Sequence, residues 1–190
     1  MNPPSPREEF LAGSREVAPS LVGTIPFGLV TGVAAIAAGL TPMQAIALSV
    51  FAFSGIAQLI ACQLIAVQSP VLLTMTAAGV VSLRLLMYSA ALAPHLAHLD
   101  RRWRLLLSYL MTDQSFATTV RRYEEPGERR WKHWHFIGSA TTLYVSWQLA
   151  VVAGVLAASG LPYRLSLIAA SVAGIAVGMA LDISRRHARR

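Results

Sequence analysis

The sequence predicts an all-α protein, a polytopic transmembrane helix bundle of about six membrane segments, some of them broken by glycine and proline. Of the 190 residues, 55% are hydrophobic and only 13% are charged, and the mean hydropathy is +0.53. Soluble domains carry charge at about 25% of their positions. Several apolar stretches also reach the ~20 helical residues that a bilayer crossing requires. These observations indicate a multi-pass membrane protein.

The apolar stretches set the expected elements in chain order. Pro42 and Pro70 stand where two of them begin, a position at which the missing proline N–H costs no helical hydrogen bond. The expected spans are 17–38, 43–66, 70–95, 134–158 and 163–181. We expect three regions in all: a polar N-terminal lead-in on the membrane surface (1–16), the transmembrane bundle (17–182) and a basic C-terminal tail (183–190).

The segment 105–120 has two interpretations. It begins with three leucines but contains Asp113, so it is a poor candidate for a span that faces lipid. Either it forms a short or broken helix that its neighbours bury, with its polar part lining a cavity, or it lies on the membrane surface as an interfacial helix. The sequence leaves both interpretations open.

The net charge of +7 indicates contact with the lipid bilayer and not with nucleic acid. Of the 16 Lys and Arg residues, 15 lie beside the ends of the apolar runs, where basic side chains meet lipid headgroups. If 105–120 crosses, eleven of them share one side against four, and both termini face the cytoplasm. If it does not cross, the C-terminus still faces the cytoplasm and the N-terminus faces out.

Arg84 lies near the middle of an expected span, where an arginine costs roughly 2.5–3.5 kcal/mol on insertion scales. Tyr88 lies four residues later, on the same helix face. Arg84 either binds the carboxylate of a solute or forms a structural ion pair with Asp113, and both roles are compatible if substrate competes for the pair. Asp113 in turn either holds an ammonium group or a proton, or caps a helix at a break.

Two further clusters place polar or flexible residues inside apolar runs. In the first, Pro26 removes a helical hydrogen bond, so the helix either breaks to bind a ligand or is only kinked. Its members are Gly23, Pro26, Phe27 and Gly28. In the second, the Gln58 amide binds a solute or makes an interhelical hydrogen bond. Its members are Ser54, Gly55 and Gln58. We expect Phe27, Phe51 and Phe53 to supply an apolar wall.

No catalytic, metal-binding or cofactor-binding motif is evident. The five histidines include two close pairs at membrane edges, but no carboxylate–histidine pattern of a metallohydrolase accompanies them. Cys62 is the lone cysteine, which rules out an internal disulfide and a cysteine-rich zinc site. There is no phosphate-binding loop. We therefore expect a protein that is not an enzyme, with no metal and no cofactor.

Four segments in this order and spacing resemble the AzlC family of branched-chain amino-acid permeases, the larger subunit of AzlC/AzlD-type exporters. The matching segments are Pro26-Phe27-Gly28, Ala38 to Pro42 followed by Ser54 to Gln58, Arg84 to Tyr88 with Pro94, and Thr112 to Ala117. The resemblance covers about residues 10–160. It differs at Ser82, where the family usually has asparagine. Family members are also longer, so the chain looks shortened near its C-terminus.

The resemblance implies export of a branched-chain amino acid, of the valine or leucine type, coupled to an ion gradient. It also implies a bacterial inner-membrane location and a small AzlD-type membrane subunit as partner. We expect Arg84, Asp113 and Tyr88, with the backbone near Gly28 and Ser54, to bind the amino-acid substrate. The alternative is a shortened, non-transporting homologue that acts as a membrane assembly partner.

Overall fold

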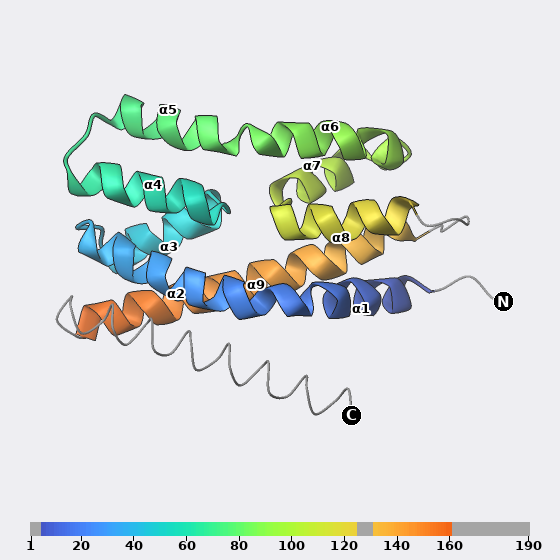
Figure 1. The fold of residues 1–190 in the computed structure, drawn as a ribbon, viewed down its shortest axis with the longest axis horizontal. Helices are drawn as coiled ribbons and strands as arrows, with labels where there is room; N and C mark the ends of the chain where they lie inside the picture. The colour runs from blue at the N-terminus through green and yellow to red at the C-terminus, as the bar shows by residue number, and fades with distance from the viewer. Residues whose placement is uncertain (1–4, 125–130, 161–190) are drawn as a thin grey trace. The chain divides into compact units, whose positions relative to one another are not determined.

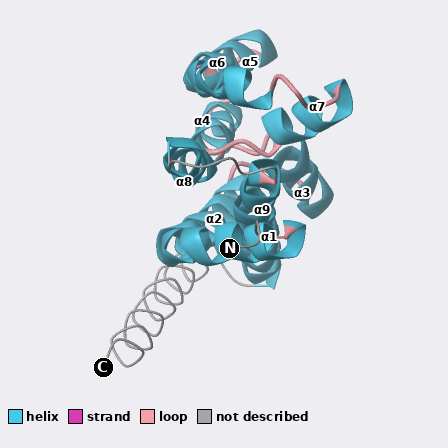
Figure 2. Cartoon of the chain, turned by 90° about the vertical axis from the view of Figure 1, so that its right-hand side faces the viewer, coloured by secondary structure: helices cyan, strands magenta, loops and turns pink. Residues whose placement is uncertain are grey.

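The computed structural model describes residues 5–124 and 131–160, and those residues form helices and connecting turns without a strand (Figure 2). This confirms the predicted all-α class. Three helices are long and apolar enough to cross a membrane: Pro6–Ala37, Val71–Leu96 and Lys132–Gly160. They correspond to the expected spans 17–38, 70–95 and 134–158. The expected span 163–181 lies outside the described residues.

The first long helix consists of α1 (Pro6–Val17), a single 3-10 turn (Ala18–Ser20) and α2 (Leu21–Ala37). The sequence interpretation placed a possible break at Pro26, and this is not observed, because α2 continues through that residue. Close packing explains the continuity: a Cβ at Gly28 or Gly32 would overlap α9, so the helix is held against a neighbour just after the proline. The change in helix type occurs at 18–20 instead.

Residues 6–17, most of the expected lead-in, form the regular helix α1. A capping box starts it: the Ser5 hydroxyl accepts from the Glu8 N–H, and the Glu8 carboxylate accepts from the Ser5 N–H. Glu9 is fully buried, and its carboxylate binds Arg122. The lead-in is thus a packed part of the fold.

The expected span 43–66 is divided into two helices, α3 (Pro42–Phe51) and α4 (Gly55–Ala66). Residues 52–54 between them are not helical. Thr41 and Gln44 form a capping box that starts α3, with Pro42 in the first turn as the sequence predicts. Ser54 makes no side-chain cap on α4, so the first backbone N–H groups of α4 lack that partner.

Two more of the expected elements, 70–95 and 105–120, are also interrupted (Figure 1). A single turn residue, Leu83, separates α5 (Val71–Ser82) from α6 (Arg84–Leu96). The ambiguous segment 105–120 becomes α7 (Arg101–Tyr109) and α8 (Asp113–Glu124), in agreement with the broken-helix interpretation. The last described helix is α9 (Lys132–Gly160).

The described residues divide into two compact units. The charged unit comprises residues 5–20 and 83–145 without 125–130, and the neutral unit comprises residues 21–82 and 146–160. The names describe their composition, since the neutral unit contains no Asp, Glu, Lys, Arg or His. The core of the charged unit is built around Leu92, Leu107 and Phe136. The core of the neutral unit is built around Trp147, Val151 and Cys62.

Candidate functional site

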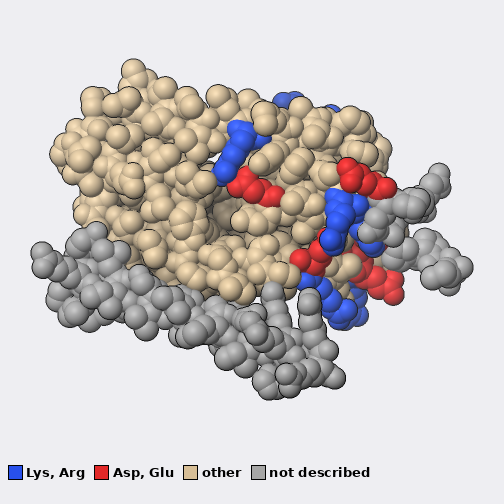
Figure 3. Space-filling view, in the orientation of Figure 1, with Lys and Arg blue, Asp and Glu red and all other residues tan. Residues whose placement is uncertain are grey.

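Arg84 and Asp113 form the predicted ion pair within the charged unit. The Arg84 Nη1 and the Asp113 Oδ2 are 3.0 Å apart, and the two side chains are 30% and 40% exposed. A basic and an acidic patch meet there, surrounded by uncharged surface (Figure 3). The pair meets the requirement that an arginine within an apolar helix find a partner.

Both residues stand at the first position of a helix, directly after an interruption. Arg84 begins α6 after the turn at Leu83, and Asp113 begins α8 after the non-helical Met111 and Thr112. The positive end of the helix dipole of α8 therefore lies next to the Asp113 carboxylate. The sequence pattern, a polar run that interrupts an apolar segment, correctly indicated this break.

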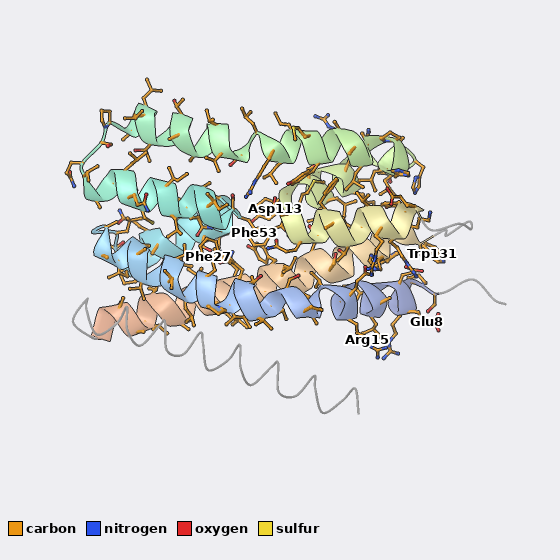
Figure 4. All side chains as sticks on the ribbon, in the orientation of Figure 1. Glu8, Arg15, Phe27, Phe53, Asp113 and Trp131 are labelled. Carbon is orange, nitrogen blue, oxygen red and sulfur yellow. The ribbon has the colours of Figure 1, made fainter. Side chains whose placement is uncertain are left out.

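Thr112, and not Asp113, caps α8. The Thr112 hydroxyl accepts a hydrogen bond from the Ser115 N–H at 3.2 Å, and the Ser115 hydroxyl accepts one from the Thr112 N–H at 2.9 Å. The alternative in which Asp113 is a helix cap is therefore wrong. Because the neighbouring hydroxyls satisfy the helix start, the Asp113 carboxylate is left for other partners. Asp113 is labelled in Figure 4.

Two atoms of the ion pair are buried without a hydrogen-bond partner among the described residues, Nε of Arg84 and Oδ1 of Asp113. The Tyr88 side chain interacts with Asp113, and its ring stacks on Phe116 with centroids 4.2 Å apart. Arg84 and Tyr88 therefore share a face of α6, as their spacing predicts. The cluster therefore has one donor atom, the Arg84 Nε, and one acceptor atom, the Asp113 Oδ1, without hydrogen-bond partners beside an aromatic surface. This arrangement suits a small ligand that carries one positive and one negative charge.

In the neutral unit, side chains hold the interruption between α3 and α4. The Gln58 Nε2 donates to the Ala52 carbonyl at 2.6 Å, and Gln58 is only 2% exposed. The Trp147 indole N–H donates to the Ser49 hydroxyl at 3.1 Å, and the Gln148 Nε2 donates to the Ser49 carbonyl at 3.1 Å. Gln58 thus bonds to a carbonyl at the break between the two helices, a role that the sequence did not specify.

Aromatic side chains pack against the start of α4. The Phe27 and Trp147 rings lie edge to face with centroids 5.5 Å apart, and a Cβ at Gly55 would collide with both of them. Phe53 packs against the same core as Phe27, and both are labelled in Figure 4. Phe51 does not belong to the expected apolar wall, because it is 84% exposed on α3. It lies at the end of its helix, directly before the break.

The structure therefore groups the predicted site residues by unit. Arg84, Tyr88 and Asp113 come together in the charged unit. In the neutral unit, Phe27 and Gly55 meet around Trp147, and Gly28 packs against the same helix at Ala150. Gly23 has open space where a Cβ would lie, and Pro26 sits inside a continuous helix. Neither makes a contact that assigns it a role.

Comparison with known proteins decides the family. The family model described as AzlC protein matches residues 19–161, which is most of the chain. The chain belongs to the AzlC family. It is also 24% identical over 153 residues to the inner membrane protein YgaZ of Escherichia coli strain K12, an alignment that covers 80% of this chain and 62% of that protein. No solved structure matches.

The family assignment places this AzlC chain in the inner membrane, as predicted. The matched region begins just before α2 and ends at the end of α9, so it contains both interruptions and the ion pair. The chain spans about 62% of the length of the curated relative.

The sequence analysis missed a second ionic cluster of this AzlC protein, in the charged unit. Arg122 binds Glu9 at 2.9 Å, and Glu16 binds both Arg121 at 2.5 Å and the His135 Nε2 at 2.9 Å. Acidic and basic side chains gather there around α1 and α8 (Figure 3). One signal was available: Glu9 and Glu16 are seven residues apart, which puts them on one helix face.

Proposed function

We propose that this AzlC-family chain is a subunit of a transporter that exports branched-chain amino acids of the valine or leucine type, coupled to an ion gradient. One observation carries the proposal: the Arg84–Asp113 pair, at the starts of α6 and α8, contains a buried donor atom and a buried acceptor atom that have no hydrogen-bond partner among the described residues. A zwitterionic amino acid presents one ammonium group and one carboxylate, and these match Oδ1 of Asp113 and Nε of Arg84.

The neutral unit contributes groups of a different kind to the proposal. Its described residues carry no charge, and Phe27 and Trp147 present aromatic edges beside Gly55. An aliphatic side chain gains free energy when it leaves water for such a surface. We therefore propose that residues of this unit, with Ser54 and Gln58 nearby in sequence as polar groups, contact apolar solute surface within this unit.

We further propose a small AzlD-type membrane subunit as the partner. The family assignment supports this, together with the large apolar surface of α5, which buries none of its own residues. The bilayer also covers apolar helices, so the partner requires a direct test. Co-purification of the tagged chain with such a subunit from detergent-solubilised membranes is that test.

Efflux of labelled valine from cells that express the chain, with and without the small subunit, tests the transport proposal. Asp113→Asn keeps the side-chain size but removes the charge, so we expect efflux to fall to background while the protein still inserts. The matched control is Asp100→Asn, an exposed carboxylate at the start of α7. We expect it to leave efflux unchanged.

Two results would change the assignment. Normal efflux by an inserted Asp113→Asn variant would remove this carboxylate from the site. Stable co-purification with the subunit, without valine efflux in any combination, would favour the alternative of a non-transporting assembly partner.

A further inference from the structure

We propose that Glu16 and His135, both in the charged unit, form a proton-binding site that couples transport to a proton gradient. The coupling rests on the proposed function and adds to it which ion is used and which residues bind it. Proton binding itself is measurable without transport. Glu16 precedes residues 19–161, the region that matches the family model, so half of the site lies in the N-terminal helix outside that region.

Close contact between α1 and α9 brings the two side chains together. A Cβ at Gly13 would overlap the His135 carbonyl, and a Cβ at Gly138 would overlap the Phe10 carbonyl, so the two backbones touch at this level. Glu16 follows Gly13 by three residues, which puts both on the helix face that meets α9. Small residues therefore fix the spacing between the helices, and the carboxylate reaches the imidazole across it.

The His135 ring has one paired nitrogen and one unpaired nitrogen. Nε2 lies 2.9 Å from the Glu16 Oε2, and the His135 side chain is only 1% exposed. Because an ionised carboxylate can only accept, Nε2 carries the hydrogen of this bond. Nδ1 is buried and has no hydrogen-bond partner within residues 5–124 and 131–160. The neutral ring therefore keeps a free lone pair at Nδ1, where a further proton can bind.

Proton uptake by the pair is a simple acid–base step. A proton from water forms an N–H bond with the lone pair of Nδ1, and the neutral imidazole of His135 becomes an imidazolium. The pair with Glu16 then changes from a net negative charge to no net charge. Release breaks the same N–H bond and returns the proton to water. Histidine is the side chain that exchanges a proton most readily near neutral pH, so no other reactant is needed.

Charged groups of α1 and α8 surround the pair. Glu9 and Arg122, which act electrostatically on His135, are bound to each other at 2.9 Å. Arg121 binds Glu16, but its side chain is 71% exposed, so water screens much of its charge. The neighbouring titratable side chains beyond these are Tyr123, His95 and Lys132. The Glu16 carboxylate is therefore the buried charge least compensated by this cluster, and a proton on His135 compensates it.

Helix α8 connects this pair to the candidate substrate site. Asp113 begins α8, and Arg121 lies eight residues later, about 12 Å along the same helix. Glu16 contacts both Arg121 and His135, so an imidazolium competes with the guanidinium for one carboxylate. A weaker contact at Arg121 allows α8 to move, and Asp113 moves with it relative to Arg84. Proton binding and substrate binding are linked in this way, and such linkage is reciprocal.

Proton binding is measured on the purified full chain in detergent, by NMR of the ring nitrogens of isotope-labelled histidine between about pH 5 and pH 8. The chain has five histidines, and the signal that is missing from His135→Gln identifies His135. We expect hydrogen on one ring nitrogen of His135 at the upper end of this range and on both at the lower end. A ring that keeps one form throughout would overturn the proposal, whether or not the chain transports valine.

Coupling is measured in liposomes that contain the full chain, with the small subunit where it co-purifies. Two rates are compared: exchange of labelled valine at equal pH, and net valine flux driven by a pH difference. His135→Gln removes the titrating ring and leaves Arg84 and Asp113 in place, so we expect exchange to persist while the gradient-driven flux falls by about tenfold. His133→Gln is the matched control, because that ring packs on Trp103 and not on Glu16. We expect it to leave both rates unchanged.

The possible outcomes separate proton coupling from the proposed function. If His135→Gln exchanges valine and responds to the pH difference as the unmodified chain does, the proton coupling is overturned. If neither the unmodified chain nor any variant exchanges valine, the proposed function fails, and the NMR titration still decides whether His135 binds a proton. Where His135→Gln does not accumulate, Glu16→Gln removes the carboxylate of the same pair, and we expect the same loss of the gradient response.

Discussion

In the charged unit, α1 is joined to α8 and α9 by ion pairs, whereas in the neutral unit α2 is joined to α9 through glycine. Glu9 binds Arg122 and Glu16 binds His135 in the first case. In the second, a Cβ at Gly32 would overlap the Val151 carbonyl, so the two backbones are in direct contact. Ion pairs therefore hold α1 in the charged unit, and close backbone contact at small residues holds α2 in the neutral unit.

The same contrast holds at the two interruptions. Between α7 and α8, reciprocal hydroxyl contacts of Thr112 and Ser115 start the helix and leave Asp113 to bind Arg84. Between α3 and α4, Gln58 bonds to the Ala52 carbonyl, and no charged group is present in that unit. A break with a charge needs a partner from another helix. A neutral break can be held by a nearby amide, so it constrains its surroundings less.

Loss of the buried ionic contact should give the largest effect on stability. Arg122→Gln leaves the fully buried Glu9 carboxylate without its cationic partner, and we expect a loss of about 3 kcal/mol. The neighbouring Arg121→Gln is the control. The Arg121 side chain is 71% exposed and Glu16 keeps His135, so that loss should stay below about 1 kcal/mol. Thermal unfolding in detergent measures both, and equal losses would contradict the difference.

Glycine packing in the neutral unit should give an intermediate effect. Gly32→Ala forces a methyl group onto the backbone of α9, and we expect a destabilisation of about 2 kcal/mol. Gly79→Ala makes the same change in α5 with open space around it, so it should stabilise by about 0.5–1 kcal/mol through helix propensity. If both variants unfolded at the same temperature, close packing of α2 on α9 would not be a stabilising contact.

The hydrogen bond beside the neutral break should give the smallest effect. Ser49→Ala leaves the buried Trp147 indole N–H without its acceptor, at a cost of about 1 kcal/mol. Ser82→Ala is the control, because that hydroxyl bonds only to Ala78 of its own helix, and its effect should be within about 0.5 kcal/mol. Chemical unfolding followed by tryptophan fluorescence separates the two variants, and a cost for Ser82→Ala as large as that for Ser49→Ala would argue against this contact.

The sequence by itself determined the helical class, the apolar segments and the charge pair. Period and length identify a helix that can cross, proline at a first turn marks its start, and an arginine in an apolar run demands a carboxylate. Asp113 was the predicted partner of Arg84 because the other expected spans contain no acidic residue. The break before Asp113 follows from polar residues that interrupt an apolar run, whereas the break at 52–54 lies within a segment that was expected to be one span.

Tertiary structure alone decided where helices stop and which contacts replace the lost hydrogen bonds. The sequence suggested a break at Pro26, but α2 continues through it. Gly28 and Gly32, which follow Pro26, pack closely against α9 and hold that part of the helix in place. Leu83 looked unremarkable and ends a helix. Single-residue propensities are worth at most about 1 kcal/mol for most residues, so contacts with neighbouring helices outweigh them. The pairing of Glu9 with Arg122 joins residues 113 positions apart, a distance over which local patterns carry no information.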